Sequence, residues 1–294
     1  MKLTRGRAVA LIGSAIVLPH CASGNANAIR VGSKNFSENI TVAEIYAGAL
    51  ERAGLSVERH MNLGSTQIAT AAMQRGDIQL YPEYTGTALI DVLHLPPRQE
   101  ATTIFATIKQ AYEQRFGLTW LKPAPANDSQ GLAVTQAVAK KYGVRTLSQC
   151  ARAAPQLRLA AVPEFVVRAD ALPGLQKYYG GFKFKSVRTF DIGLQYEALQ
   201  RGDADAATVF TTDALIAANN LVVLQDDRHF WPPYNIAPVV RLDTLRAHPQ
   251  IAATLNRIAP LLTDSALRGF NVEVDLRKRE PAEVAAQFLK AHGS

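Results

Sequence analysis

A 17-residue stretch occurs twice in this chain, and it limits the folds that the chain can adopt. Residues 74–90 read QRGDIQLYPEYTGTALI and residues 200–216 read QRGDADAATVFTTDALI, so the copies align without a gap, 126 residues apart, with eight identities. Each copy follows a helical pattern, breaks at Gly-Asp, enters a short apolar run and ends in a Thr-rich turn before another apolar stretch. The pattern predicts a helix–strand–turn–helix unit in each copy, and therefore two similar lobes.

Each copy carries an aromatic residue at the same place, Tyr84 in the first and Phe210 in the second. Both lie at the far end of the predicted strand, and ligands of open α/β sheets bind in the crevice beyond the carboxyl ends of the strands. We therefore expect each lobe to offer one aromatic wall to a shared cleft. The alternative is coincidence between two common α/β patterns, against which eight identities without a gap argue.

The first 28 residues have the composition of a secretory signal peptide. Three basic residues lie among the first seven, and residues 8–18 form an apolar stretch that is too short to span a bilayer. Residues 26–28, Ala-Asn-Ala, supply small residues at the cleavage positions. We expect cleavage after Ala28 and a periplasmic protein. Lipid anchoring at Cys21 is the alternative, which the preceding Pro-His pair disfavours.

Removal of this segment changes what the composition implies. The formal net charge falls from +7 to +4, because the segment holds three basic and no acidic residues. No cluster of Lys and Arg follows a helix face, so the charge predicts no nucleic-acid partner. Of the two cysteines only Cys150 remains, so we expect no internal disulfide.

Alternating strand and helix patterns follow from residue 29. A strand at 29–31, a helix at 37–53, a strand at 57–63 and a helix up to Arg75 predict an α/β fold with a mostly parallel sheet. Another helix is expected at 164–171, and the C-terminal segment is expected to be helical to about its end.

Two segments rich in Pro and other breakers divide the chain. They lie at 122–127, KPAPAN, and at 226–234, DDRHFWPPY, and are typical of connections between lobes. Two such crossings make the first lobe discontinuous. We expect lobe I to comprise residues 29–125 and 231–294, and lobe II to comprise residues 126–230.

Patterns that would carry catalysis or metal binding are weak. The five histidines after residue 28 show no metal-ligand spacing, and residues 202–205 offer too few ligands for a calcium loop. Cys150 lies in a helical pattern typical of a buried thiol. Neither a Gly-rich phosphate loop nor a GxSxG elbow occurs. We therefore expect no enzyme activity, no cofactor and no metal.

Several longer segments resemble the osmoprotectant-binding proteins of ABC importers, which capture glycine betaine, choline and related quaternary ammonium compounds. The similarity runs from Ile29 to nearly the C-terminus, and YPEYTGT and DDRHFWPPY are its most specific segments. Other matching segments are VGSKNFSENI at 31–40, PAPAND at 123–128 and EFVVRADALPGLQKYYG at 164–180. The resemblance implies a two-lobed α/β periplasmic-binding-protein fold of type II with a hinged cleft between the lobes. It also implies an ABC transporter permease as the partner. We expect the protein to be a monomer.

The resemblance implies which residues surround the cation of the ligand. Tyr84 and Tyr234 match aromatic walls of an ammonium cage, and Phe210 stands where the family usually has a tyrosine. Asp128 matches a polar partner near the cation. Gln130 occupies a position that is commonly aromatic, so one side of the cage lacks a ring. The PAPAN and RADALP segments are similar to the periplasmic branch of the family with weaker betaine affinity.

For the acid end of the ligand, the resemblance implies two cations and a hydroxyl. Lys34 and Arg168 match the cations that hold the carboxylate, and Thr87 matches a hydroxyl that assists them. The planar fork of Arg suits bidentate carboxylate binding. As an alternative, Arg168 could form a structural salt bridge to Asp170 or Glu164. Lys34 could be a solvated turn residue.

The residues that match the ammonium cage could instead have ordinary structural roles. Phe210 alone would be a core residue, and the two tyrosines would be buried with bonded hydroxyls. Asp128 would cap the turn after Asn127. Joint placement at strand ends and at a crossing favours the cleft. A quaternary ammonium cannot donate hydrogen bonds, and aromatic faces, at about 0.5–2 kcal/mol per ring, are suited to it.

The sequence thus predicts an extracytoplasmic solute receptor that delivers a zwitterionic quaternary ammonium compound to a permease. Gln130 and Phe210 leave open the same receptor fold with a site for an amino acid or another polar zwitterion. A periplasmic enzyme on this scaffold is less favoured, because no reactive group falls in the expected cleft.

Overall fold

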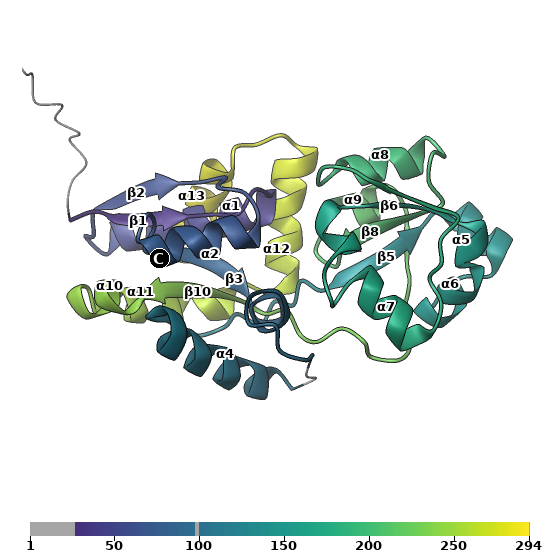
Figure 1. Cartoon of the computed structure of the whole chain (residues 1–294). Helices are drawn as coiled ribbons and strands as arrows, with labels where there is room; N and C mark the ends of the chain where they lie inside the picture. Colours follow the sequence, from purple (N-terminus) through teal and green to yellow (C-terminus); the bar gives the residue numbers. More distant parts are fainter. Residues whose placement is uncertain (1–26, 98–99, 294) are drawn as a thin grey trace, which may run out of the picture.

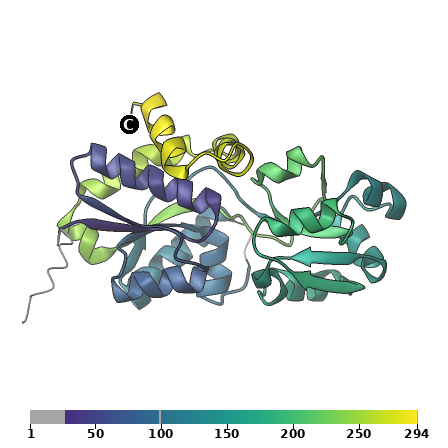
Figure 2. The same cartoon turned by 90° about the horizontal axis from the view of Figure 1, so that it is seen from above.

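Two five-stranded sheets, each covered by helices, form the interior of the computed structural model, which describes residues 27–97 and 100–293. Figure 1 shows the two lobes side by side, with the start and the end of the chain in one lobe and its middle in the other. The view from above in Figure 2 separates the same two bodies. The signal-peptide prediction falls almost entirely on residues 1–26, which lie outside the described residues.

The first sheet has the order β2-β1-β3-β10-β4. Its strands are β1 (Ile29–Gly32), β2 (Val57–His60), β3 (Leu80–Tyr84), β4 (Leu118–Trp120) and β10 (Ile236–Arg241). β1 runs parallel to β2 and β3, whereas β10 runs antiparallel to β3 and β4. The sheet that was expected to be mostly parallel is therefore mixed, because β10 returns from the other lobe and enters from the opposite end.

The second sheet repeats this plan in the order β7-β6-β8-β5-β9. Its strands are β5 (Gln130–Val134), β6 (Arg158–Ala161), β7 (Ser186–Thr189), β8 (Ala206–Phe210) and β9 (Val222–Val223). β6 is parallel to β7 and β8, and β5, which follows the first crossing, is antiparallel to β8. In each lobe, then, the strand that enters from a crossing lies beside the strand of the repeated stretch.

The pairing register places the repeated aromatics at equivalent points. Tyr84 is opposite Ile236, and Phe210 is opposite Gln130. The repeat itself forms the predicted units. In the first lobe α2 (Thr66–Arg75) leads into β3 and the short helix α3 (Thr85–Thr87), and in the second α8 (Leu194–Gln200) leads into β8 and α9 (Ala214–Ala218). The helix–strand–turn–helix prediction is confirmed for both copies.

The remaining helices cover the sheets. In the first lobe they are α1 (Ser37–Arg52), α4 (Ala101–Phe116), α10 (Leu242–Ala247), α11 (Gln250–Ile258), α12 (Asp264–Asn271) and α13 (Pro281–Ala291). In the second they are α5 (Gln136–Tyr142), α6 (Leu147–Ala153) and α7 (Leu172–Tyr179). A π-helical turn, Val272–Leu276, follows α12. The C-terminal segment is largely helical to Ala291, as expected.

The prediction of a helix at 164–171 is wrong. Only a 3-10 turn, Pro163–Val166, forms there, and the helix proper begins at Leu172. Pro173 explains the boundary, because it lacks the N–H that would bond to the carbonyl of Ala169 and its ring would clash with that carbonyl, so it is tolerated only in the first turn of a helix. The strand expected to reach Leu63 ends at His60, since Asn62 takes a positive φ of 59°.

The two crossings lie against each other. Asn127 and Asn235 form an antiparallel bridge, and the backbone N–H of Tyr234 donates to Oδ1 of Asn127 at 2.6 Å. The N–H of Asp128 donates to the carbonyl of Tyr234 at 3.2 Å. The connection between the lobes is therefore a hydrogen-bonded pair of segments, although the exact lobe limits remain a prediction. Among the described residues, no helix combines the length and apolarity needed to cross a membrane.

Candidate functional site

A cavity of about 80 Å³ lies between the lobes at the carboxyl ends of β1, β3, β6 and β8. A volume of this size holds several waters and therefore a small solute. All eight residues that the sequence singles out line it: Lys34, Tyr84, Thr87, Asp128, Gln130, Arg168, Phe210 and Tyr234. They come from both lobes and from the second crossing, so the fold brings together residues up to 200 positions apart.

Aromatic side chains form much of the wall. Tyr84 and Phe210 lie at the ends of β3 and β8, and Tyr234 lies in the second crossing. Two further aromatics that the sequence analysis missed also line the cavity, Phe36 and Phe165. Each follows the end of a strand, β1 or β6, which is the signal that could have identified them. Phe36 stacks on Tyr84, with 6.1 Å between ring centroids and 27° between planes.

The ammonium of Lys34 already lies over this aromatic wall. Its Nζ is 4.8 Å from the ring centroid of Tyr84 and 5.6 Å from that of Phe36. Nζ also donates to Oε1 of Glu83 at 2.6 Å and to Thr66 at 3.3 Å. Because Lys34 is only 4% exposed, the alternative of a solvated turn residue is wrong. The wall accepts a positive charge, and Glu83 balances it.

Arg168 forms the salt bridge that the sequence left open, and it lines the cavity as well. Its guanidinium donates to both carboxylate oxygens of Asp170, at 2.8 and 2.6 Å, and lies 3.7 Å from Asp91 of the other lobe. Asp170 therefore holds the fork in place. Thr87, at the end of the turn after β3, is buried beside the same cavity.

Gln130 is part of the same network. Its Nε2 donates to Oδ2 of Asp170 at 2.8 Å and contacts the hydroxyl oxygen of Tyr234 at 3.3 Å, while that hydroxyl donates to Asp170 at 2.5 Å. Burial and the neighbouring Asp170 raise the pKa of Tyr234 well above its usual value. The missing ring at position 130 is thus replaced by an amide that orders Asp170, and through it Arg168 and Tyr234.

Asp128 also lines the cavity. Its Oδ1 accepts from the backbone N–H and the hydroxyl of Thr212, at 3.2 and 2.8 Å, rather than from the turn after Asn127. Thr212 also contacts Glu38 of α1, and the hydroxyl of Tyr84 donates to Glu38 at 2.7 Å. Thr212 is the residue of the second repeat that corresponds to Gly86 of the first, so the two copies differ at this contact.

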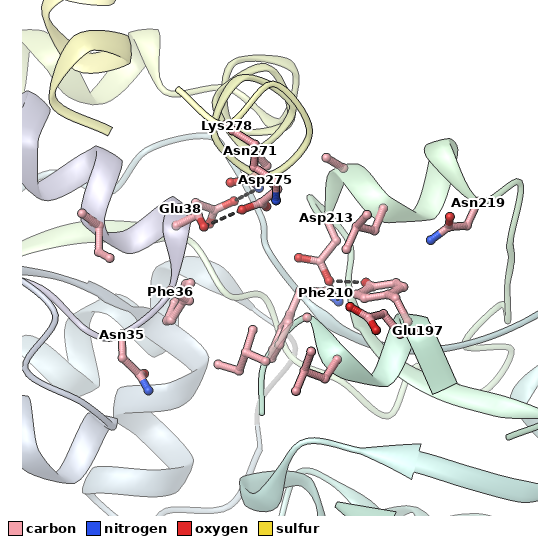
Figure 3. Close-up of a pocket in the computed structure, with 18 of the residues that line it drawn as sticks. Asn35, Phe36, Glu38, Glu197, Phe210, Asp213, Asn219, Asn271, Asp275 and Lys278 are labelled. Atoms are coloured by element: carbon pink, nitrogen blue, oxygen red, sulfur yellow. Dashed lines mark hydrogen bonds between the residues drawn. The ribbon is translucent and has the colours of Figure 1, made fainter. Parts of the chain in front are cut away.

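The small cavity continues into a larger cleft of about 710 Å³. The two share Asn35, Phe36, Asp128, Ile192 and Phe210. Figure 3 shows Glu38, Asn271 and Asp275 on one wall of this cleft and Asp213 and Phe210 on the other. Among the described residues, no group of three or more His, Cys, Asp or Glu side chains is placed to hold a metal ion.

The cysteine offers no chemistry to the site. Cys150 is free and buried in the second lobe, and burial raises the pKa of its thiol to about 12. A thiol is a nucleophile only when ionised, so this one is inert at neutral pH.

Two α/β lobes joined by two crossings, with a cavity whose walls come from both, define a solute-binding protein that encloses a small molecule between its lobes. The comparisons with known proteins agree. A model of the family described as the substrate binding domain of ABC-type glycine betaine transport systems matches residues 27–291, and the chain belongs to this family.

Relatives confirm the fold. The glycine-betaine-binding protein of Pseudomonas aeruginosa is 34% identical over 277 residues, which cover 91% of this chain and 88% of that protein. The ergothioneine transport permease/ergothioneine binding protein EgtU of Helicobacter pylori is 34% identical over 264 residues, 90% of this chain but only 47% of that protein. A crystal structure titled glycine betaine/carnitine/choline ABC transporter has a TM-score of 0.75 at 31% identity and covers 90% of this chain and 98% of that one.

Proposed function

We propose that this protein captures a zwitterionic quaternary ammonium compound, such as glycine betaine or choline-derived betaines, between its lobes and delivers it to the permease of an ABC importer. One observation supports this most: eight residues chosen from the sequence for that chemistry line a single cavity between the lobes. The protein would then act in transport and not as an enzyme.

The walls suit the two ends of such a ligand. Tyr84, Phe210 and Tyr234 offer faces to a cation that cannot donate hydrogen bonds, and each well-placed ring contributes about 0.5–2 kcal/mol. Phe36 adds a fourth face. On the same cavity, the guanidinium of Arg168, already held by Asp170, offers N–H groups to a carboxylate.

Ligand capture would close the lobes. A ligand that contacts both lobes stabilises the closed arrangement more than the open one, which shifts the population toward closure. Arg168 and Asp91 already form an ion pair between the lobes. The wall residues therefore belong to surfaces that approach one another when the cavity closes.

Calorimetric titration with glycine betaine, choline, carnitine and ergothioneine tests the proposal. Ergothioneine is included because a relative of 34% identity carries it in its name. We expect at least one of the four to bind with a dissociation constant below 1 mM. An unmethylated amino acid, glycine, serves as the control for the methyl groups. If glycine binds and none of the four compounds does, the site is that of an amino-acid receptor, which is the alternative that the sequence left open.

Export through a signal peptide cut after Ala28 is part of the proposal. That cut would make Ile29, the first residue of β1, the new N-terminus. Mass determination of the protein from a periplasmic extract tests it. We expect the mass of residues 29–294, unchanged by Cys21→Ala. A lipid-modified mass that disappears in Cys21→Ala would show anchoring instead.

A further inference from the structure

One hydroxyl lies between two buried carboxyls where the lobes meet. Oγ1 of Thr212, in the second lobe, is 2.5 Å from Oε2 of Glu38 and 2.8 Å from Oδ1 of Asp128. Glu38 belongs to α1 of the first lobe, and Asp128 directly follows the first crossing. Glu38 is 3% exposed, Asp128 7% and Thr212 1%, so water does not screen the contact.

The number of protons at this contact follows from the geometry. A threonine hydroxyl has one hydrogen and can point it along only one of the two contacts. The other contact would place an oxygen lone pair against an ionised carboxylate at hydrogen-bond distance, which is repulsive. If that carboxyl carries a proton, it donates to the hydroxyl and both contacts are attractive. One proton on either Glu38 or Asp128 therefore satisfies all three groups.

The other donors around the pair do not remove this requirement. Glu38 also accepts from the hydroxyl of Tyr84 at 2.7 Å and from Nδ2 of Asn271 at 3.0 Å. Asp128 also accepts from the backbone N–H of Thr212. None of these groups gives its proton to a carboxylate at neutral pH, and neither carboxyl has an Arg, Lys or His salt-bridge partner among the described residues.

The charged surroundings favour the proton as well. Asp275, from the π-helical turn, faces Glu38, and Asp213, from the turn before α9, faces Asp128. The positive charge of Lys278 acts in the opposite direction on Asp275, whose pKa it lowers. Burial is the largest cause that raises the pKa of Glu38 and of Asp128, and their mutual repulsion raises that of Asp128 further.

We propose that Glu38 and Asp128 share one proton through the hydroxyl of Thr212, so that the carboxyl pair of the empty site carries a single negative charge and releases this proton to the solvent when a cation enters the cavity. The second half rests on the proposed function. Asp128 lines the cavity, and a permanent positive charge beside it favours its ionised form. Glu38 and Thr212 thereby become positioning residues that tune the site for permanent cations.

Infrared difference spectroscopy of the ligand-free protein tests the shared proton without any ligand. At pH 8, we expect a carbonyl band of a protonated carboxylic acid that shifts in ²H₂O. Glu38→Gln and Asp128→Asn should each abolish the band, because either amide removes the need for a proton on the remaining carboxyl. Glu44→Gln, a buried carboxyl of the same helix that pairs with Arg59 at 2.7 Å, should leave the band intact. Thr212→Ser, which keeps the hydroxyl, should retain it too.

Two results would overturn the shared proton. One is the absence of the band in the wild-type protein. The other is a band that disappears in only one of the two variants, which would assign the proton to a single buried carboxyl. Circular dichroism establishes that each variant is folded. If one amide variant is not, the wild-type band and its loss in the other variant still test the proposal, and persistence of the band there would overturn it.

Titration of glycine betaine in buffers of different ionisation enthalpy tests the exchange. We expect about one proton to be released per molecule bound at pH 7, and about none in Asp128→Asn. Binding without proton release contradicts the exchange. If glycine betaine does not bind at all, the proposed function fails for that ligand, while the infrared result stands separately.

Discussion

The three aromatic residues of the cavity that the sequence identified differ in what their polar ends do. The hydroxyl of Tyr84 donates to Glu38, that of Tyr234 donates to Asp170, and Phe210 has none. Each tyrosine side chain is therefore anchored through its hydroxyl by a carboxyl group. Phe210 is fixed by packing and by the strand that carries it.

The ring of Tyr84 should contribute more to cation binding than the amide of Gln130. Tyr84→Ala removes a face worth about 0.5–2 kcal/mol and should weaken glycine betaine binding by roughly 3- to 30-fold. Gln130→Ala removes an amide that lines the cavity but offers no ring to the cation, and should cost less than about 3-fold. Tyr84→Phe, which keeps the ring, is the matched control, and calorimetry measures all three. Equal losses in Tyr84→Ala and Gln130→Ala would contradict the aromatic cage.

Substitution of Arg168 distinguishes the two roles that the sequence left open for it, binding of the ligand carboxylate and a structural salt bridge. If its fork holds the ligand carboxylate, Arg168→Lys should weaken glycine betaine binding by about 10-fold or more and leave choline, which lacks a carboxylate, within about 2-fold. If Arg168 is only the structural partner of Asp170, both affinities should fall together. Titration of the two ligands against one variant decides between them.

At the scale of the elements, the turn after β3 depends on a glycine that approaches another element closely. A Cβ on Gly86 would lie 2.6 Å from the ring of Tyr234 and 3.0 Å from the carbonyl of Pro233. We expect Gly86→Ala to displace that ring, to destabilise the protein by about 1–3 kcal/mol and to weaken betaine binding.

Gly269 supplies the control for this change. It lies in α12, and a Cβ there would meet no atom within 4 Å. Gly269→Ala should stabilise the protein by about 0.5–1 kcal/mol through its helix propensity and leave binding unchanged. Urea unfolding together with calorimetry compares the two variants. A Gly86→Ala protein with unaltered stability and affinity would show that the turn relaxes freely.

The elements also show how far the sequence alone reaches. Strand ends could be predicted, because apolar runs and the repeat mark them, and those ends placed Tyr84 and Phe210 correctly at the cavity. The strand β7 was missed because all four of its residues are exposed and carry no apolar alternation. Long-range partners were missed for another reason. Glu83 beside Lys34, and Glu38 beside Thr212, are contacts across 49 and 174 residues that no local pattern encodes.

For the whole molecule, the carboxyls between the lobes make stability depend on pH. Burial raises the pKa of Asp213 from 3.8 to about 7. Between these values the folded protein holds a proton that the unfolded chain has lost, so the free energy of unfolding should fall as the pH rises from about 4 to about 7 and then level off.

Urea unfolding of the ligand-free protein at pH 5 and pH 7 checks this dependence. We expect the protein to be more stable at pH 5 by about 2 kcal/mol from this group. Asp213→Asn keeps an oxygen that can accept from Tyr196 and from the N–H of Phe210, and should flatten the dependence. The same slope in the variant and the wild type would assign the effect to other groups.

The paired crossings have a mechanical consequence. Two tethers joined by the Asn127–Asn235 bridge define an axis, and a ribbon of this kind bends across its face more readily than it stretches or shears. A rotation of the lobes about this axis would change the distance between Tyr84 and Phe210, which line the cavity from different lobes. The width of the solute that fits between the two rings would then depend on how far the lobes had rotated.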